Sequence, residues 1–267
     1  MMLWTLHQGA SPLVLDVPHA GTHIPDAIAL RLTDAARTVP DTDWHVDRLY
    51  AFAAAADATL LCATQSRYVV DLNRDPSGAA LYPGADNTEL CPTRTFGGEP
   101  IYADNDVLNE REILARRHTF FDPYHAQLVR EIARVRATHG HAILLDGHSI
   151  RARVPRFFDG RLPDLNLGTS EGRSCDPALR TFASALLGDA AGFTSVVDGR
   201  FKGGYVTRHH GRPADGVHAL QLEMAQECYM DEDRAETYDP ARAAPLCAFL
   251  ERLVVSLSEW RPAVSRA

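Results

Sequence analysis

Short runs of apolar residues, rich in β-branched and aliphatic side chains, recur along the chain and predict the strands of a sheet. Several of these runs are largely apolar instead of alternating with polar residues, which is typical of central strands covered on both faces in an α/β protein. The strands are predicted at residues 13–17, 59–63, 68–72, 142–145, 194–197 and 219–222.

Helical patterns lie between these runs. Residues 46–56 are rich in alanine, and Asp43 is placed to cap their start. Residues 105–139 form a long helical pattern that we expect to break near Asp122-Pro123, because proline disrupts an interior turn. Helices are also predicted at 177–187, where Asp176 caps a proline at the first position, and at 240–257. Residues 75–100 and 149–174 are predicted as long loops, which in compact domains are often functional.

No repeat, low-complexity tract or linker-like run divides the chain, so residues 1–267 are predicted to form a single domain. The fold class expected is α/β, with a mixed central sheet flanked by helices. A hydrophobic fraction of 45% with 23% charged residues is ordinary for a globular enzyme.

The charge balance limits the partners that this chain can have. With 27 basic and 35 acidic side chains its formal net charge is -8, which argues against the basic face of a nucleic-acid-binding protein. An acidic small molecule can still bind through a few arginines in a pocket. Five scattered cysteines indicate reduced structural thiols, and no signal peptide or bilayer-spanning run is present, so a cytoplasmic location is expected. A homo-oligomer is compatible with these patterns.

Reactive side chains follow several of the predicted strands. His19 follows the first run, His148 follows Asp146-Gly147 after another, and both are candidate metal ligands. A single histidine at such a place is often only a structural hydrogen-bonding residue, but a pair at the carboxyl ends of strands favours a site. Catalytic zinc commonly takes three protein ligands and leaves a position for water. The segment DTDWHVD offers Asp41, Asp43 and Asp47 as the third ligand.

Other polar residues suggest a base and a substrate-binding group. Glu223 follows an apolar run, so partial burial would raise its pKa and suit a general base, although a salt bridge with an arginine is an equally good interpretation. Asn73 and Arg74 place an amide beside a guanidinium, which binds carboxylates with two parallel hydrogen bonds. Alternatively, they form a turn asparagine and a surface arginine.

The segment GRFKGGYVTRHHGRP, residues 199–213, combines glycines with cations that could meet an anion. Its candidate groups are Lys202, Arg208, His209 and His210. The alternative is a flexible surface hairpin. The glycine–lysine spacing is not that of a phosphate-binding loop, which excludes that kind of nucleotide site.

Several strings taken together resemble the N-formylglutamate amidohydrolase (deformylase) family. They are VPHAGTHIP, DTDWHVDRLY, RYVVDLNRDP, LLDGHS, DLNLGTSEGRSCDP, GRFKGGYVTRHHG and LQLEMAQECYMDE, and they run in order from about residue 13 to about residue 232. This family is in turn distantly similar to the zinc carboxypeptidases and aspartoacylase. That resemblance implies a phosphorylase/hydrolase-like α/β fold and one catalytic zinc ion, although other divalent metal ions accept the same ligand types.

The resemblance also implies roles for particular residues. PHAG and DGH imply the zinc ligands His19 and His148, and LEM implies Glu223 as the group that activates water. The carboxypeptidase-like proteins place a glutamate three residues after their first histidine, where this chain has Thr22. The carboxylate ligand must therefore come from elsewhere, and Asp43 is preferred, followed by Asp47.

For the substrate, DLNR implies that Asn73 and Arg74 hold a carboxylate, and Arg208 or Lys202 is expected to hold another. Arg208 or His209 would steady the oxyanion. The reaction implied is hydrolysis of N-formyl-L-glutamate to formate and L-glutamate, the last step of a histidine degradation route. Two alternatives are a deacylase for another N-acyl amino acid or peptide, and a metal-binding protein without turnover.

Overall fold

A computed structural model describes residues 2–81, 84, 86–103 and 106–263 of this chain. Seven strands form one mixed sheet in the order β1-β3-β2-β4-β7-β5-β6. Their bounds are β1 Trp4–His7, β2 Leu13–Val17, β3 Thr59–Ala63, β4 Ala142–Ile150, β5 Leu165–Gly168, β6 Ser195–Val197 and β7 Val217–Ala225. The helices are α1 Asp26–Ala29, α2 Asp34–Arg37, α3 Val46–Leu49, α4 Glu110–Arg116, α5 Asp122–His139, α6 Pro177–Gly188, α7 Tyr205–His210 and α8 Pro240–Glu259.

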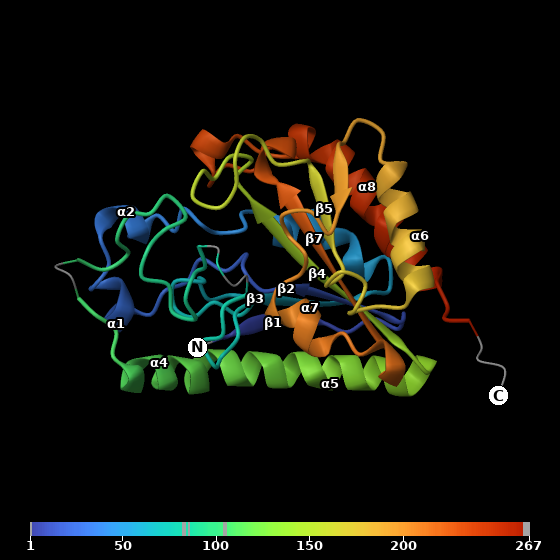
Figure 1. The fold of residues 1–267 in the computed structure, drawn as a ribbon, viewed down its shortest axis with the longest axis horizontal. Helices are drawn as coiled ribbons and strands as arrows, with labels where there is room; N and C mark the ends of the chain where they lie inside the picture. The colour runs from blue at the N-terminus through green and yellow to red at the C-terminus, as the bar shows by residue number, and fades with distance from the viewer. Residues whose placement is uncertain (1, 82–83, 85, 104–105, 264–267) are drawn as a thin grey trace.

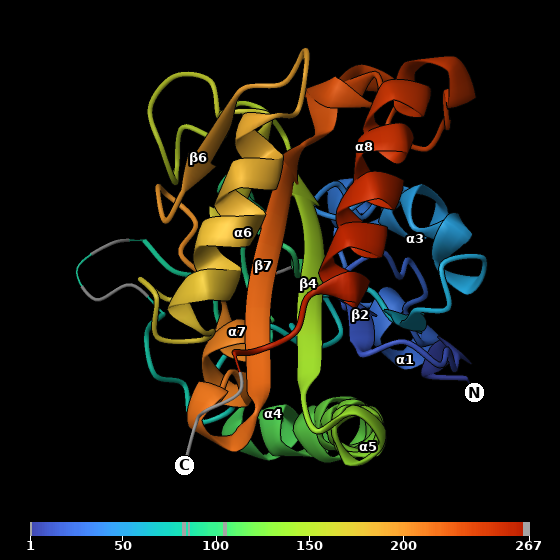
Figure 2. The same cartoon turned by 90° about the vertical axis from the view of Figure 1, so that its right-hand side faces the viewer.

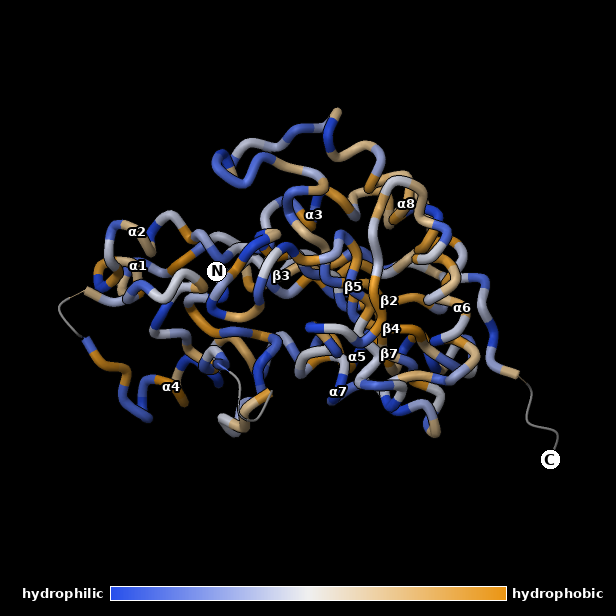
Figure 3. Tube along the Cα trace, turned by 45° about the horizontal axis from the view of Figure 1, so that its top comes forward, coloured by the Kyte–Doolittle hydropathy of each residue, from blue (hydrophilic) through white to orange (hydrophobic). Residues whose placement is uncertain are grey.

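Helices cover both faces of the sheet, which confirms the predicted α/β class (Figures 1 and 2). Strands β3, β2, β4 and β7 run parallel at its centre, whereas β1 pairs antiparallel with β3 and β5 pairs antiparallel with β7 and parallel with β6. One core cluster packs α3, α6 and α8 on one face, and a second packs α5 and α7 on the other. The hydrophobic segments are concentrated along β2, β4 and β7 (Figure 3). Among the described helices, none is both long and apolar enough to cross a bilayer.

The alternation of side chains along the central strands separates the apolar core from the polar residues. Leu145 and Leu222 belong to the cluster under α6 and α8, whereas the neighbouring positions Asp146 and Glu223 face the α5 side. Both strands are longer than predicted. His148 and Glu223 therefore lie within β4 and β7, near their carboxyl ends, instead of in the loops beyond them.

Three predictions about strands and loops were wrong. Residues 68–72 form a buried turn, in which the Val69 amide donates to Ser66 and the Asp71 amide donates to Leu90. Their apolar run reflects burial in the α5-side cluster, which periodicity alone does not distinguish from a strand. β1 was not predicted, and β5 lies inside the predicted loop 149–174, where its four residues are too few to show a pattern.

The helices also differ from the sequence pattern in instructive ways. The 46–56 pattern is a short α3 followed by a 3-10 turn, and its N-cap is His45 in the left-handed region, so Asp43 is not the cap. The start predicted at Asn105 lies outside the described residues. Near Pro123 the chain forms a π turn, Arg117–Phe121, and continues into α5 along the same axis, because such a turn re-satisfies the backbone that proline disrupts (Figure 1).

Candidate metal centre

A cavity opens above the carboxyl ends of β2, β4 and β7. Its lining includes His19, Asp43, His148 and Glu223, which the sequence predicted as site residues. Arg74 and Asn73 line it as well. Arg208 and His209 instead line a neighbouring hollow with Tyr205, so their role in substrate binding stays a prediction.

His19, Asp43 and His148 form the centre of this site. One potential ligand atom from each lies within 4.8 Å of the others, and all three side chains are buried. His148 Nδ1 lies 2.9 Å and His19 Nδ1 lies 3.8 Å from the same oxygen, Asp43 Oδ2. Asp47 is exposed on α3, and Asp41 bonds the Tyr68 hydroxyl, so Asp43 is the carboxylate that meets the histidines.

Each histidine has a buried carboxylate behind it. His19 Nε2 lies 2.8 Å from Asp71 Oδ1, and His148 Nε2 lies 2.8 Å from Asp146 Oδ1. Asp71 accepts a hydrogen bond from His19 Nε2 and leaves Nδ1 as the basic atom of that ring. The Nδ1 atoms of both histidines lie toward Asp43, which is the arrangement that a metal ion bound by two imidazoles and one carboxylate requires.

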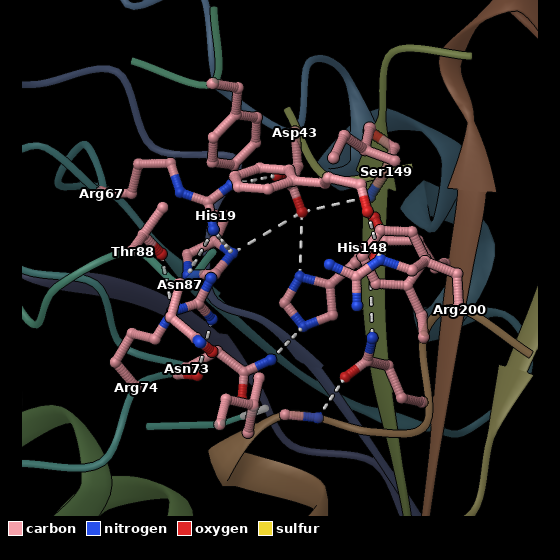
Figure 4. Close-up of a pocket in the computed structure, with 18 of the residues that line it drawn as sticks. His19, Asp43, Arg67, Asn73, Arg74, Asn87, Thr88, His148, Ser149 and Arg200 are labelled. Atoms are coloured by element: carbon pink, nitrogen blue, oxygen red, sulfur yellow. Dashed lines mark hydrogen bonds and ion pairs between the residues drawn. The ribbon is translucent and has the colours of Figure 1, made fainter. Parts of the chain in front are cut away.

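Asn73 helps to orient His148. Its Oδ1 accepts from the Val206 amide at 2.8 Å, which turns Nδ2 toward His148 Nε2 at 2.9 Å and Asp146 Oδ2 at 3.2 Å (Figure 4). This contact requires glycine at position 204, because a Cβ there would lie 2.4 Å from the Asn73 amide. The glycine-rich segment therefore leads into α7 and packs on the site, instead of forming a free hairpin.

Arg67 is a buried cation that the sequence analysis missed. Its guanidinium bonds Asp43 Oδ1 at 3.2 Å, Asp71 Oδ2 at 3.0 Å and the Asp41 carbonyl at 3.1 Å, and it lies 3.0 Å from His19 Nδ1. Burial opposes ionisation, but Arg74, His19 and Arg67 together hold the pKa of Asp71 well below its usual range. His148 and His19, with Arg67, likewise lower the pKa of Asp43 despite its burial.

The charges around the histidines favour a further cation. Asp43, Asp71 and Asp146 are all buried, whereas Arg67 is the buried guanidinium among them. Against the effect of burial, Asp146 and Asp43 raise the pKa of His148 well above its usual value. A proton on that ring partly balances the surplus negative charge, and a divalent ion would balance it more fully. The donor set and the charge therefore both fit a metal ion.

Glu223 lies beside His148 because β4 and β7 pair in register at these two residues. Its Oε2 accepts from Gln221 Nε2 at 3.2 Å, and Gln221 Oε1 in turn accepts from the Gly204 amide. In the part of the chain that the structure describes, no arginine forms an ion pair with Glu223, so the salt-bridge alternative does not hold. Burial raises the pKa of this carboxyl to about 8.

Asp71, Asp146 and Arg200 are further lining or supporting residues to which the sequence analysis assigned no role. Asp71 and Asp146 each end an apolar run just before a residue that the motifs singled out, and this position was the available signal. Arg200 lines the cavity from the loop after β6. It belongs to the glycine-rich segment 199–213, whose candidate groups in the sequence analysis were other cations.

Comparisons with known proteins agree with this geometry. Residues 11–230 match the model of the N-formylglutamate amidohydrolase family. The N-formylglutamate deformylase of Pseudomonas putida is 43% identical over 256 residues, covering 96% of each chain. That of Pseudomonas aeruginosa is 45% identical over 253 residues, covering 95% of each.

Solved structures show the same fold. The N-formylglutamate amidohydrolase of Ralstonia eutropha superposes with a TM-score of 0.82 at 29% identity, over 97% of this chain and 98% of that one. A gene product of Agrobacterium tumefaciens shares the fold at a TM-score of 0.71 and 19% identity, over 96% and 94% of the two chains. From the matched sequence and the shared fold, this chain belongs to the N-formylglutamate amidohydrolase family.

Proposed function

We propose that this protein hydrolyses N-formyl-L-glutamate to formate and L-glutamate, with one zinc ion held by His19, Asp43 and His148. The observation that carries the proposal is the convergence of these three buried side chains, with ligand atoms within 4.8 Å of one another, beside a buried glutamate. The family membership and the deformylase activity in the names of the two Pseudomonas relatives support the choice of substrate.

The ligand types suit this metal and this chemistry. Two imidazoles and a carboxylate form a common protein set for catalytic zinc, which keeps a further position for water. Bound there, zinc would supply Lewis acidity, which lowers the pKa of water and polarises a carbonyl oxygen. Other divalent ions accept the same donors. Asp71 keeps His19 in the tautomer that such binding needs.

Glu223 acts as the proton carrier of the reaction. Its pKa of about 8 lies close to neutral pH, where a carboxyl can both accept and return a proton. As a water oxygen bonds to the formyl carbon, Glu223 accepts a proton from that water. It then gives the proton to the amide nitrogen while the carbon–nitrogen bond breaks, which releases formate and the amine of L-glutamate.

The lining of the cavity suits a small acidic N-acyl amino acid. Arg74 lines the cavity. Its Nε donates to Thr88 Oγ1 at 2.7 Å and its Nη1 donates to the Asn73 carbonyl at 3.0 Å, so the guanidinium is held in place. Asn73 acts chiefly by fixing His148 and the turn before α7. All five cysteines lie in the described part of the chain and are unpaired. Free thiols are typical of cytoplasmic proteins, so a cytoplasmic location is proposed for this enzyme, with its reaction ending a histidine degradation route.

The test is hydrolysis of N-formylglutamate by the purified protein, beside N-acetylglutamate, before and after chelation. Formate release that vanishes with the metal and returns with zinc supports the proposal. Equal or faster cleavage of N-acetylglutamate would indicate a deacylase of different acyl specificity. A metal-loaded protein that cleaves neither compound would contradict the proposal and leave a metal-binding protein without turnover.

A further inference from the structure

Arg74 and Arg200 line the cavity from different parts of the chain. Arg74 follows the buried turn that carries Asp71, whereas Arg200 lies on the loop between β6 and α7. Figure 4 shows their guanidinium groups directed toward the centre of the site from opposite sides of His148. A substrate with two carboxylates can therefore meet a separate arginine at each end.

Arg74 is linked to the metal-ligand cluster through Asp71. Its Nη2 lies 3.9 Å from Asp71 Oδ2, and the other oxygen of Asp71 lies 2.8 Å from His19 Nε2. One carboxylate thus separates Arg74 from a metal ligand. A substrate carboxylate held by Arg74 therefore lies on the His19 side of the site, where a carboxylate next to the scissile amide would be.

Arg200 has two aromatic neighbours, Phe157 and Phe201. Its Nε donates to the Phe157 carbonyl at 2.7 Å, and its Cζ lies 5.8 Å from the centre of the Phe201 ring. Phe157 and Phe201 pack against the small cluster that contains Ile150, and all three line the cavity with Arg200. This wall offers an apolar surface for methylene groups, with a guanidinium beside it.

The shape of N-formylglutamate matches this division. Its α-carboxylate is attached to the carbon that bears the amide nitrogen, whereas its side-chain carboxylate lies beyond the methylene groups. Resting on the proposed function, we infer that Arg74 binds the α-carboxylate and that Arg200 binds the side-chain carboxylate. Arg200 is then the residue that selects an acidic side chain, and the wall of Ile150, Phe157 and Phe201 packs on the methylenes.

The experiment removes each carboxylate from the substrate and each arginine from the protein. The substrates are N-formylglutamate, N-formylglutamine, which lacks the side-chain carboxylate, and the α-amide of N-formylglutamate, which lacks the other. Loss of a charge-assisted hydrogen bond should lower kcat/KM for N-formylglutamate about 10- to 100-fold in Arg200→Gln. The same variant should cleave N-formylglutamine within about twofold of the wild type, because that interaction is already missing.

Arg74→Gln should show the converse pattern. It should lower kcat/KM for N-formylglutamate and N-formylglutamine, and it should cleave the α-amide within about twofold of the wild type. Arg200→Lys should recover part of the selectivity, since it restores the charge without the planar fork. Arg153→Gln is the matched control, because Arg153 is an arginine on the segment after β4 whose side chain is 62% exposed. Its preferences should equal those of the wild type.

Two results would overturn the inference. In one, Arg200→Gln slows all three substrates alike, as a merely structural arginine would. In the other, Arg200→Gln leaves cleavage of the α-amide unchanged, and Arg74→Gln leaves cleavage of N-formylglutamine unchanged. If the wild type releases formate from none of the three, the proposed function fails. The binding of L-glutamate and L-glutamine, measured by calorimetry, then tests the role of Arg200 by itself. A wild type that prefers L-glutamate, and an Arg200→Gln variant that does not, supports the assignment; an unchanged preference contradicts it.

Discussion

Replacement of Arg67 by methionine tests how the charges of the metal centre are balanced. Arg67 is 6% exposed and bonds two carboxylates of the site, Asp43 and Asp71, within 3.2 Å. Methionine keeps an apolar stem of similar length next to Phe96 but removes the guanidinium. Asp43 would then stay buried without its guanidinium, and Asp71 would keep only that of Arg74, 3.9 Å away.

The expected cost is large. Removing one partner of a buried ion pair typically destabilises a protein by about 3–5 kcal/mol, because the remaining charge is left uncompensated. A domain has about 5–15 kcal/mol of stability in total. We therefore expect Arg67→Met to lose a fifth or more of the free energy of unfolding. Arg67→Lys, which keeps the charge but not the fork between Asp43 and Asp71, should lose less.

The assay is urea unfolding of metal-free protein at neutral pH, followed by the same titration with zinc. Zinc should stabilise Arg67→Met by more than it stabilises the wild type, since an added cation replaces part of the missing charge. The surface variant Arg153→Met should change the free energy of unfolding by less than about 0.5 kcal/mol. A loss below about 1 kcal/mol in Arg67→Met, or equal stabilisation of both proteins by zinc, would refute this reasoning.

Three further predictions concern the base, a buried histidine and a glycine. Glu223→Gln should lower kcat by about 10²- to 10⁴-fold while zinc content, measured by elemental analysis, stays that of the wild type; substantial residual activity would exclude Glu223 as the base. Burial lowers the pKa of His125 to about 4, below its unfolded value, so protonation of the unfolded chain should cost about 2–3 kcal/mol of stability between pH 6.5 and 4.5. Urea unfolding at these two pH values checks this, and His125→Gln should be less sensitive; an equal loss in both proteins would contradict it. Gly204→Ala should displace Asn73 and weaken zinc binding about 10- to 100-fold, whereas Gly188→Ala, with open space around the added Cβ, should bind zinc normally in a competition titration with a chelator; equal affinities would contradict the clash.

Much of the fold could be predicted from local pattern. The runs at β2 and β3 and the capped start of α6 at Asp176 appear in the structure where the sequence placed them. Continuous apolar runs correctly indicated a sheet covered on both faces. The same signal misled at residues 68–72, because a buried turn and a buried strand need the same apolar side chains.

The candidate site divides in the same way. His19, His148 and Glu223 were recognisable because each follows or ends an apolar run, and parallel strands bring such ends to one edge of the sheet. The choice of Asp43 over Asp47 needed the resemblance to a family and then the structure, in which Asp47 is exposed and Asp43 meets both histidines.

Tertiary structure alone decided which charges surround those ligands. Arg67 and Asp71 reach His19 from a turn that is distant in sequence, and no local pattern encodes such a distance. It also separated Arg200, which lines the cavity, from Arg208, which lines the neighbouring hollow, although both belong to one cationic segment. The sequence by itself determined which residue types are present and, through their periodicity, which runs are buried. The chain path of the loops determined where each charge lies, because loop paths depend on contacts summed over the whole fold.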